Sequence, residues 1–128
     1  MEITSKGYEP IELITIKGRV DSIESAGLAK ALKAAHHHGK HTLVVDMSQV
    51  EYMSSAGFRA LGDAQRNLKR QQAGEVILAQ VPPHIHEALE LVGFTEYFHI
   101  CDSVTAAMEY ATNGSAGTSA ASPSPAVP

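Results

Sequence analysis

Three short runs of strand-forming residues, each followed by a segment with helical periodicity, limit what this chain can fold into. The runs occupy residues 42–47, 75–81 and 97–100. Residues 42–47 are apolar on both faces, which is typical of a strand that helices cover on each side. An alternation of strands and helices favours parallel neighbouring strands joined by right-handed crossovers. We therefore expect an α/β fold with a mostly parallel sheet of roughly four to five strands and about four helices.

The N-terminal part of the chain is expected to add an antiparallel edge to this sheet. Residues 11–20 alternate apolar and polar side chains closely enough to indicate a strand. Residues 3–8 form a shorter candidate strand, and a turn at Glu9 and Pro10 separates it from residues 11–20. Two strands this close in sequence pair antiparallel, so the sheet as a whole should be mixed.

Capping residues and apolar stripes outline the first two helices. Asp21 is a candidate N-cap, and Glu24 three residues later completes a capping box. The helix that follows is expected to end at Gly39. Its buried face consists of Leu28, Ala31, Leu32 and Ala35. A second helix is expected over residues 56–72, with Gly74 after its end. Its apolar stripe is Phe58, Leu61 and Leu68, and its outer face carries Arg59, Arg66 and Lys69.

The last two helices show similar markers. Pro82 and Pro83 open the third helix, because a missing amide proton costs little in the first turn. Gly93 closes it. Its buried face is expected to contain Ile85, Leu89 and Val92. Asp102 is expected to cap the final helix. The inward residues of that helix are Val104, Ala107, Met108 and Ala111.

The length and a change in composition set the domain boundaries. A chain of 128 residues is long enough for one domain and too short for two ordinary ones. From residue 113 to the end the chain contains only Asn, Gly, Ser, Ala, Thr, Pro and Val. Such a segment cannot bury enough surface to offset the entropy lost on ordering. We therefore expect a folded domain over residues 1–112 and a disordered tail over residues 113–128.

Charge and cysteine content narrow the class of partner and the compartment. The 10 Lys and Arg residues against 14 Asp and Glu residues give a net charge of −4, and no basic cluster is present that would bind nucleic acid. Cys101 is the only cysteine, which excludes an internal disulfide and favours a reducing compartment. No signal peptide and no apolar run of membrane-spanning length are visible. These features predict a cytoplasmic protein without a membrane partner.

The most informative stretch lies at residues 44–61, VVDMSQVEYMSSAGFRAL. A buried strand ends near Asp46, a short loop crosses the surface, and a Ser-Ser-Ala-Gly turn starts a helix. This arrangement resembles the STAS domain family, which is named for sulfate transporters and anti-sigma factor antagonists. The resemblance covers residues 1–112, including the GRVD turn at residues 18–21 and the VGF turn at residues 92–94.

A free-standing domain of this length is similar to one branch of the family, the bacterial anti-sigma factor antagonists. In that branch an anti-sigma factor that is also a kinase phosphorylates a serine at the helix start. The unphosphorylated protein captures the kinase and frees the sigma factor. Aligning residues 52–57 with the family pattern implies that Ser55 is the phosphoacceptor and that Asp21 lies near it. The implied partners are an anti-sigma factor serine kinase and a serine phosphatase. The implied partner-binding residues are Asp21, Ser54, Ser55, Ala56, Gly57 and Arg59.

Two positions depart from the family pattern. Ser54 stands where the family usually has Asp, which removes a negative charge beside the acceptor. Ala56 replaces a second hydroxyl residue, which leaves Ser54 as the alternative acceptor in the motif.

The same serines also have a purely structural interpretation. Serine is a favoured N-cap, so the role of Ser54 or Ser55 can be to hold the first helical turn, worth about 1 kcal/mol. A phosphate at that position is tolerated, because free amides and the positive end of the helix dipole surround it. A second hypothesis for function is a STAS module that binds a small ligand or nucleotide, or that belongs to a transporter or lipid-trafficking complex.

The histidines do not form a convincing metal site in the sequence. Those at residues 36–38 and 41 lie at a helix end and point in different directions, and no cysteine or nearby carboxylate completes a tetrahedral set. His84 and His86 cannot share one face of a helix. We expect no metal and no other cofactor.

No pattern of catalytic residues is recognisable either. A serine hydrolase has a Gly-x-Ser-x-Gly turn, and Met53 occupies the first glycine position before Ser55. Neither a Walker loop nor a dinucleotide-binding fingerprint is present. The sequence predicts a binding protein and not an enzyme.

Overall fold

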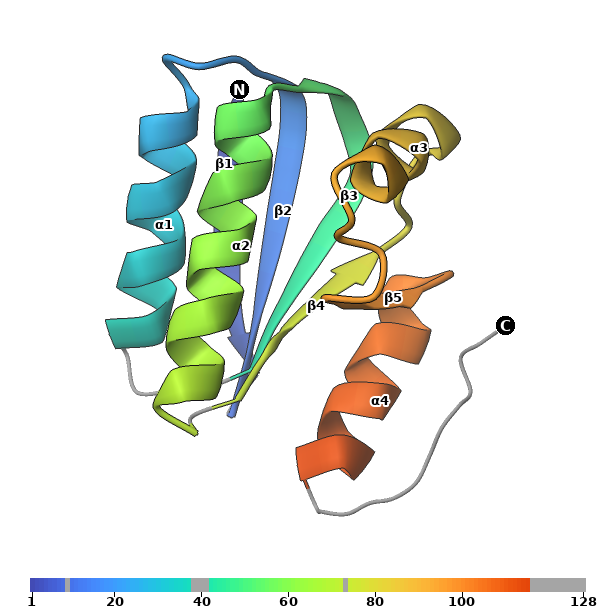
Figure 1. Ribbon diagram of the computed structural model, residues 1–128. Helices are drawn as coiled ribbons and strands as arrows, with labels where there is room; N and C mark the ends of the chain where they lie inside the picture. The colour runs from blue at the N-terminus through green and yellow to red at the C-terminus, as the bar shows by residue number, and fades with distance from the viewer. Residues whose placement is uncertain (9, 38–41, 73, 116–128) are drawn as a thin grey trace.

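Two consecutive strands open the chain, and helices and strands alternate after them, in the computed structural model, which describes residues 1–8, 10–37, 42–72 and 74–115 (Figure 1). The strands are β1 (Glu2–Tyr8), β2 (Ile11–Val20), β3 (Thr42–Met53), β4 (Val76–Ala79) and β5 (His99–Cys101). The helices are α1 (Ser25–His37), α2 (Ser55–Arg70), α3 (Pro83–Leu91) and α4 (Val104–Ser115). The described residues thus form one five-stranded sheet and four helices, which confirms the expected α/β class.

The sheet is mixed, as the sequence predicts. Its strands lie in the order β1-β2-β3-β4-β5. β1 pairs antiparallel with β2, and the other neighbours are parallel. Helices α1 and α2 lie side by side over one face of the sheet (Figure 1), and α4 packs against β3 and β4 on the opposite face.

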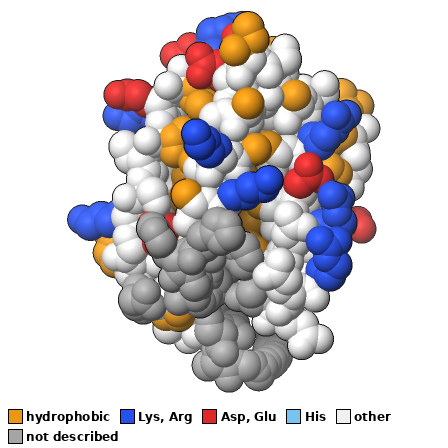
Figure 2. Space-filling model, turned by 90° about the vertical axis from the view of Figure 1, so that its left-hand side faces the viewer, with side chains coloured by type: hydrophobic (Ala, Val, Ile, Leu, Met, Phe, Trp, Pro, Cys, Tyr) orange, Lys and Arg blue, Asp and Glu red, His pale blue; other side chains and the backbone are white. Residues whose placement is uncertain are grey.

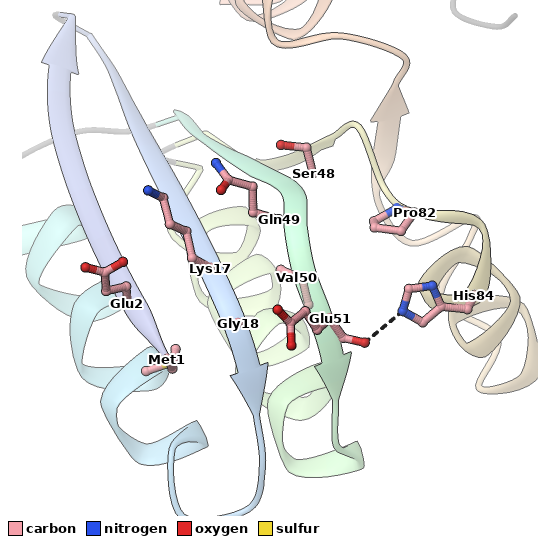
Figure 3. Close-up of a pocket in the computed structure, with 10 residues that line it drawn as sticks. All are labelled: Met1, Glu2, Lys17, Gly18, Ser48, Gln49, Val50, Glu51, Pro82 and His84. Atoms are coloured by element: carbon pink, nitrogen blue, oxygen red, sulfur yellow. Dashed lines mark hydrogen bonds between the residues drawn. The ribbon is translucent and has the colours of Figure 1, made fainter.

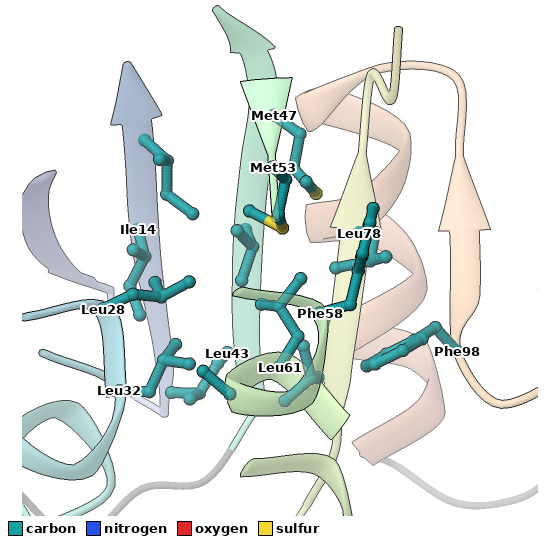
Figure 4. Packing of buried hydrophobic residues seen from close by; sticks show 14 of the residues in the cluster. Ile14, Leu28, Leu32, Leu43, Met47, Met53, Phe58, Leu61, Leu78 and Phe98 are labelled. Carbon is teal, nitrogen blue, oxygen red and sulfur yellow. The ribbon is translucent and has the colours of Figure 1, made fainter. Parts of the chain in front are cut away.

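Two hydrophobic cores lie on opposite faces of the central strands. Leu43, Val45 and Leu78 belong to the larger core, which also contains side chains of α1, α2 and α3. Figure 4 shows Leu43 and Leu78 packed with labelled side chains of α1 and α2. Their neighbours Val44 and Ile77 belong to the smaller core, together with Ala107 and Ala111 of α4. Because both faces of β3 are covered here, its sequence shows no alternation of apolar and polar residues.

Strand β3 is longer than its sequence predicts. It continues beyond Asp46 to Met53, where a surface loop was expected. Its second half pairs with residues 17–20 of β2 across two register shifts. The buried residues in this half are Met47, Val50 and Met53. Buried residues three positions apart are typical of an irregular, bulged strand, and they do not show the strict alternation by which a regular strand is predicted.

Several helix ends differ from the expectation by a few residues. Helix α2 spans 55–70 and not 56–72. Val92 is 48% exposed and not buried, because it forms the C-cap of α3, beyond the last helical turn. Ser103 and not Asp102 caps α4, since the Ala106 N–H donates to Ser103 Oγ at 3.0 Å.

The boundary between the domain and its tail is described only in part. Helix α4 continues to Ser115, so residues 113–115 form its last turn. The expected features at Glu9, at Gly39 and at residues 116–128 lie outside the described residues. The disordered tail therefore stays a prediction.

A buried glutamine joins α2 to two other segments. Gln65 is fully buried, and its side chain makes two hydrogen bonds to the backbone. Its Oε1 accepts from the Val76 N–H at the start of β4, and its Nε2 donates to the Tyr97 carbonyl before β5, both at 2.7 Å. Gln65 thereby fixes α2 relative to the sheet. The sequence pattern of the helix did not indicate this role, because it identifies buried apolar residues and not buried polar ones.

Histidine 99 lies in an aromatic contact at the edge of the sheet. The rings of His99 and Tyr110 stack with centroids 3.6 Å apart and an angle of 3° between their planes. Within the described residues, His99 Nε2 is buried and has no hydrogen-bond partner. Burial lowers the pKa of His99, although the Glu75 carboxylate acts in the opposite direction. The fold therefore favours the neutral ring.

This contact predicts a loss of stability in mild acid. In the unfolded chain His99 binds a proton as the pH falls through about 6.5, whereas in the folded chain it binds the proton only at lower pH. The free energy of unfolding should therefore decrease as the pH falls below about 6.5. His99→Phe keeps the stack but cannot be protonated, and we expect it to lose less unfolding free energy than wild type between about pH 7.5 and 5.5. Urea titrations at both pH values measure this. The exposed-histidine control, His84→Gln, should behave like wild type, and an equal acid sensitivity of His99→Phe would refute the interpretation.

Candidate functional site at the start of helix α2

The candidate site lies where two neighbouring parallel strands end. Val20 at the end of β2 pairs with Met53 at the end of β3, and the Ser54 N–H donates to the Val20 carbonyl at 2.8 Å. Asp21 and Ser54 directly follow these paired residues. The topology therefore brings Asp21 beside the Ser54–Ser55 turn, as the family resemblance implies.

Asp21 holds the first turn before α1. Its Oδ1 accepts hydrogen bonds from the backbone N–H groups of Ile23 at 3.0 Å and Glu24 at 2.8 Å. The Asp21 carbonyl also accepts from the Ser25 N–H at 2.9 Å. Asp21 therefore caps the turn at residues 22–24 that leads into α1 and not α1 itself, which begins at Ser25. Its carboxylate remains exposed at the edge of the site.

The two adjacent serines have different environments. Ser54 is the N-cap of α2 in extended backbone conformation, and its half-buried hydroxyl accepts from the Gly57 N–H at 3.3 Å. Ser55 is the first helical residue, and its side chain is exposed. The structural role expected for one of the serines thus belongs to Ser54, and the hydroxyl of Ser55 is accessible to a partner.

The rest of the motif lines the first turns of α2. Arg59 is exposed and follows Ser55 by four residues, so the two side chains lie on one face of the helix. Ala56 is half-buried and Gly57 is buried. A negative group on Ser55 would lie close to the positive end of the helix dipole and to the Arg59 face.

Glycine at position 57 allows α2 to approach the sheet closely. A Cβ atom there would lie 2.7 Å from Met53 Cγ and 3.1 Å from Val20 Cγ1. Both neighbours belong to the strands that end at the site. Any larger residue must therefore displace the Met53 side chain or move the helix start away from the strand ends that carry Ser54 and Asp21.

We expect Gly57→Ala to destabilise the protein by about 1 kcal/mol. The overlap with Met53 and Val20 costs about 1–3 kcal/mol and exceeds the gain of about 1 kcal/mol in helix propensity. Gly27→Ala in α1 is the matched control, since its Cβ would meet only Met1 Cε at 3.4 Å, and it should be neutral or stabilising. Chemical denaturation measures both. A Gly57→Ala variant more stable than wild type would contradict the close approach.

Three further exposed residues lie at the end of the sheet where β2 and β3 finish, and the sequence did not single them out. Ile23 is 84% exposed in the turn before α1, and Tyr52 is 41% exposed two residues before Ser54. The Arg19 guanidinium lies over the Tyr52 ring, 4.7 Å from its centroid. Figure 2 shows hydrophobic and charged side chains close together at this end of the molecule, its top in Figures 1 and 2. Exposed aromatic, apolar and arginine side chains are typical of protein-binding surfaces. In the sequence, the one indication of this surface was Ile23, an apolar residue within the otherwise polar turn DSIE at residues 21–24.

A hollow of about 850 Å³ lies beside the end of β3, over the part of the sheet that α4 leaves open (Figure 3). His84 Nε2 makes a hydrogen bond of 2.9 Å with the Glu51 carbonyl at its rim. The lining includes side chains of both charges, among them Glu2 and Lys17. A shallow surface of mixed charge does not favour one class of small ligand.

No group of three or more His, Cys, Asp or Glu side chains in the described part of the chain could hold a metal ion. Of the clustered histidines, residues 38 and 41 lie outside the described residues, and the side chains at 36 and 37 are also not described. The expected absence of a metal therefore stays a prediction.

The fold and the site together define a mixed-sheet α/β domain that presents an exposed serine at a helix start between two strand ends. The family model of the STAS domain matches residues 2–107. The chain belongs to the STAS domain family.

Similar proteins include anti-sigma factor antagonists. The chain is 31% identical over 107 residues to BtrV of Bordetella bronchiseptica, which is named as an anti-sigma factor antagonist; the match covers 84% of this chain and 91% of BtrV. Its fold also matches the anti-sigma factor antagonist SpoIIAA in the unphosphorylated form, with a TM-score of 0.76 at 14% identity over 88% of this chain and 97% of SpoIIAA. SpoIIAA of Bacillus in the phosphorylated form matches with a TM-score of 0.67, at 14% identity over 84% and 97% of the two chains.

The fold by itself does not decide the function. The murine anion transporter Slc26a9 contains a similar domain, with a TM-score of 0.70 at 18% identity over 81% of this chain and 18% of the transporter. In the described part of this chain, no helix has the length and apolar character needed to cross a membrane. The exposed serine and its surroundings must therefore carry the functional argument.

Proposed function

We propose that this chain is an anti-sigma factor antagonist that captures an anti-sigma factor at the start of α2. Phosphorylation of Ser55 by that anti-sigma factor, acting as a kinase, ends the capture, and a serine phosphatase restores it. The observation that carries the proposal is the exposed Ser55 side chain at the first helical position, next to Ser54, which already serves as the cap.

The relatives support the same function. BtrV, at 31% identity, is named as an anti-sigma factor antagonist. SpoIIAA has been solved in unphosphorylated and phosphorylated forms, so a protein of this fold accepts a phosphate. The site of this chain fits the role of a substrate, because the reactive hydroxyl is exposed while ATP and a general base come from the kinase.

Local electrostatics explain how the phosphate acts on binding and leaves the fold intact. A phosphoserine adds about −1.5 to −2 charges, and the N-terminus of a helix favours an anion by roughly 0.3–1 kcal/mol. Ile23 and Tyr52 are exposed at the same end of the sheet as Ser55 and offer apolar contacts, and Arg19 and Arg59 offer donors. A partner packed over these groups would have to desolvate the phosphate, which opposes binding.

Release of a sigma factor tests the function. Each anti-sigma factor kinase encoded in the same genome is bound to its labelled sigma factor, and this chain is titrated into the complex without ATP. We expect release from one of the complexes, and we expect Ser55→Ala to release the sigma factor as well as wild type. If a large excess of the chain releases none of the sigma factors, the proposed function is wrong.

A further inference from the structure

Strand β1 is an open edge of the sheet. It is the terminal strand in the order β1-β2-β3-β4-β5, and in the described part of the chain it pairs only with β2. Its seven residues are exposed apart from the half-buried Ile3. The backbone N–H and C=O groups on its outer side are a template for pairing with another strand.

The charges along β1 are complementary to a second copy of the same strand. In antiparallel pairing around a two-fold axis at Thr4, Glu2 of one copy lies opposite Lys6 of the other, and the same pair occurs again across the axis. Both side chains lie on the sheet face opposite Ile3, because successive residues of a strand alternate. Opposite charges placed directly across an antiparallel pair stabilise it, and like charges destabilise it.

The surface next to this edge combines small apolar residues with two polar side chains. A groove between β1 and α1 is lined by Ile3 and Ser5 of β1, by Glu12 of β2 and by small residues of α1, among them Ala31 and Ala34. Figure 2, which shows the molecule from the left-hand side of Figure 1, has patches of hydrophobic side chains between separate Lys and Arg side chains on this face. Small residues on α1 let a second helix come close when two sheets join edge to edge.

We propose that the chain forms a symmetric dimer in which the β1 strands of two copies pair antiparallel around Thr4, with Glu2 opposite Lys6 in both directions. The interface is isologous, and it joins the two five-stranded sheets into one continuous sheet. The start of α2 lies at the carboxyl ends of β2 and β3 and not along β1 (Figure 1), so both Ser55 sites stay open in the dimer. The dimer is therefore independent of the proposed function.

Charge reversal tests the register of this dimer. Sedimentation equilibrium of the full chain, with any affinity tag at the C-terminus, measures the dissociation constant over a wide range of concentrations. Glu2→Lys and Lys6→Glu each turn two attractive pairs into repulsive ones, and each should weaken the dimer at least about ten-fold. The double variant Glu2→Lys/Lys6→Glu restores both pairs and should dimerise again.

An equimolar mixture of the two single variants is the sharpest form of the test. Glu2→Lys carries lysine at both positions of β1 and Lys6→Glu carries glutamate at both, so each variant repels itself. In the mixed pair every lysine faces a glutamate, and we therefore expect a heterodimer with nearly wild-type affinity, weakened by added salt.

Two charge reversals elsewhere on the surface are the controls. Lys33→Glu and Glu109→Lys change the net charge by the same amounts at exposed positions on α1 and α4, and they should leave the dimer unchanged. Unfolding curves confirm that every variant is folded. A wild-type chain that stays monomeric at all concentrations, or a mixture that stays monomeric, would overturn the proposal.

Discussion

Replacing Gln65 by leucine is expected to lower the free energy of unfolding by about 2–5 kcal/mol. The Gln65 side chain is fully buried. It makes hydrogen bonds of 2.7 Å to the Val76 N–H and to the Tyr97 carbonyl, and both backbone groups would lose this partner. Each buried polar group left without a hydrogen bond costs about 1–3 kcal/mol, and the similar size of leucine does not compensate. Urea denaturation measures the change.

The control for this prediction is another glutamine in the same fold. Gln49 is exposed on β3, so Gln49→Leu should change stability by no more than about 0.5 kcal/mol. If Gln65→Leu fell within the same range, the two hydrogen bonds would not hold α2 in place. The loss should also extend to function, because α2 carries Ser55 at its first residue.

Ser55→Asp is expected to weaken binding to the proposed anti-sigma factor kinase by roughly thirty- to a thousand-fold, about 2–4 kcal/mol. The carboxylate places a charge where a partner meets a neutral hydroxyl, and that charge must be desolvated in the complex. Stability should change little, because the first turn of a helix tolerates an anion. The interface effect therefore exceeds the folding effect. Isothermal titration calorimetry with the kinase measures the affinity.

Thr105→Asp provides a matched control for this variant. Thr105 is also an exposed hydroxyl residue in the first turn of a helix, α4, which packs on the opposite face of the sheet. It should bind the kinase like wild type. Equal affinities for Ser55→Asp and wild type would refute the switch, whereas a loss of affinity in both variants would indicate a nonspecific effect of charge.

Periodicity in the sequence predicts most of the framework because the central strands and helices obey regular burial rules. Residues 42–47 showed a strand buried on both faces, and two cores indeed lie on either side of it. The second half of β3 could not be predicted, because its burial repeats every three residues across an irregular pairing with β2. The cap of α4 moved to Ser103 because adjacent Asp and Ser residues are both favoured N-caps.

The candidate site shows the same division between local and tertiary information. The helix start at Ser54 and Ser55 follows from the sequence, since serine at an N-cap has a local role. The position of Asp21 next to Ser54 and Ser55 follows from the parallel pairing of β2 with β3. In the sequence, only the family resemblance implies it. Ile23, Tyr52 and Gln65 escaped notice because exposure of an apolar residue and burial of a polar one depend on tertiary packing.

Phosphopeptide mapping tests the central claim, that Ser55 is the switch, most directly. The wild-type chain, Ser54→Ala and Ser55→Ala are each incubated with the kinase and ATP, and the modified residue is located by fragment mass spectrometry. We expect one phosphate on Ser55 in the wild type and in Ser54→Ala, which loses about 1 kcal/mol of stability with its cap but keeps the acceptor. We expect none on Ser55→Ala. Phosphate on Ser54 alone, or an equally phosphorylated Ser55→Ala, would contradict the account.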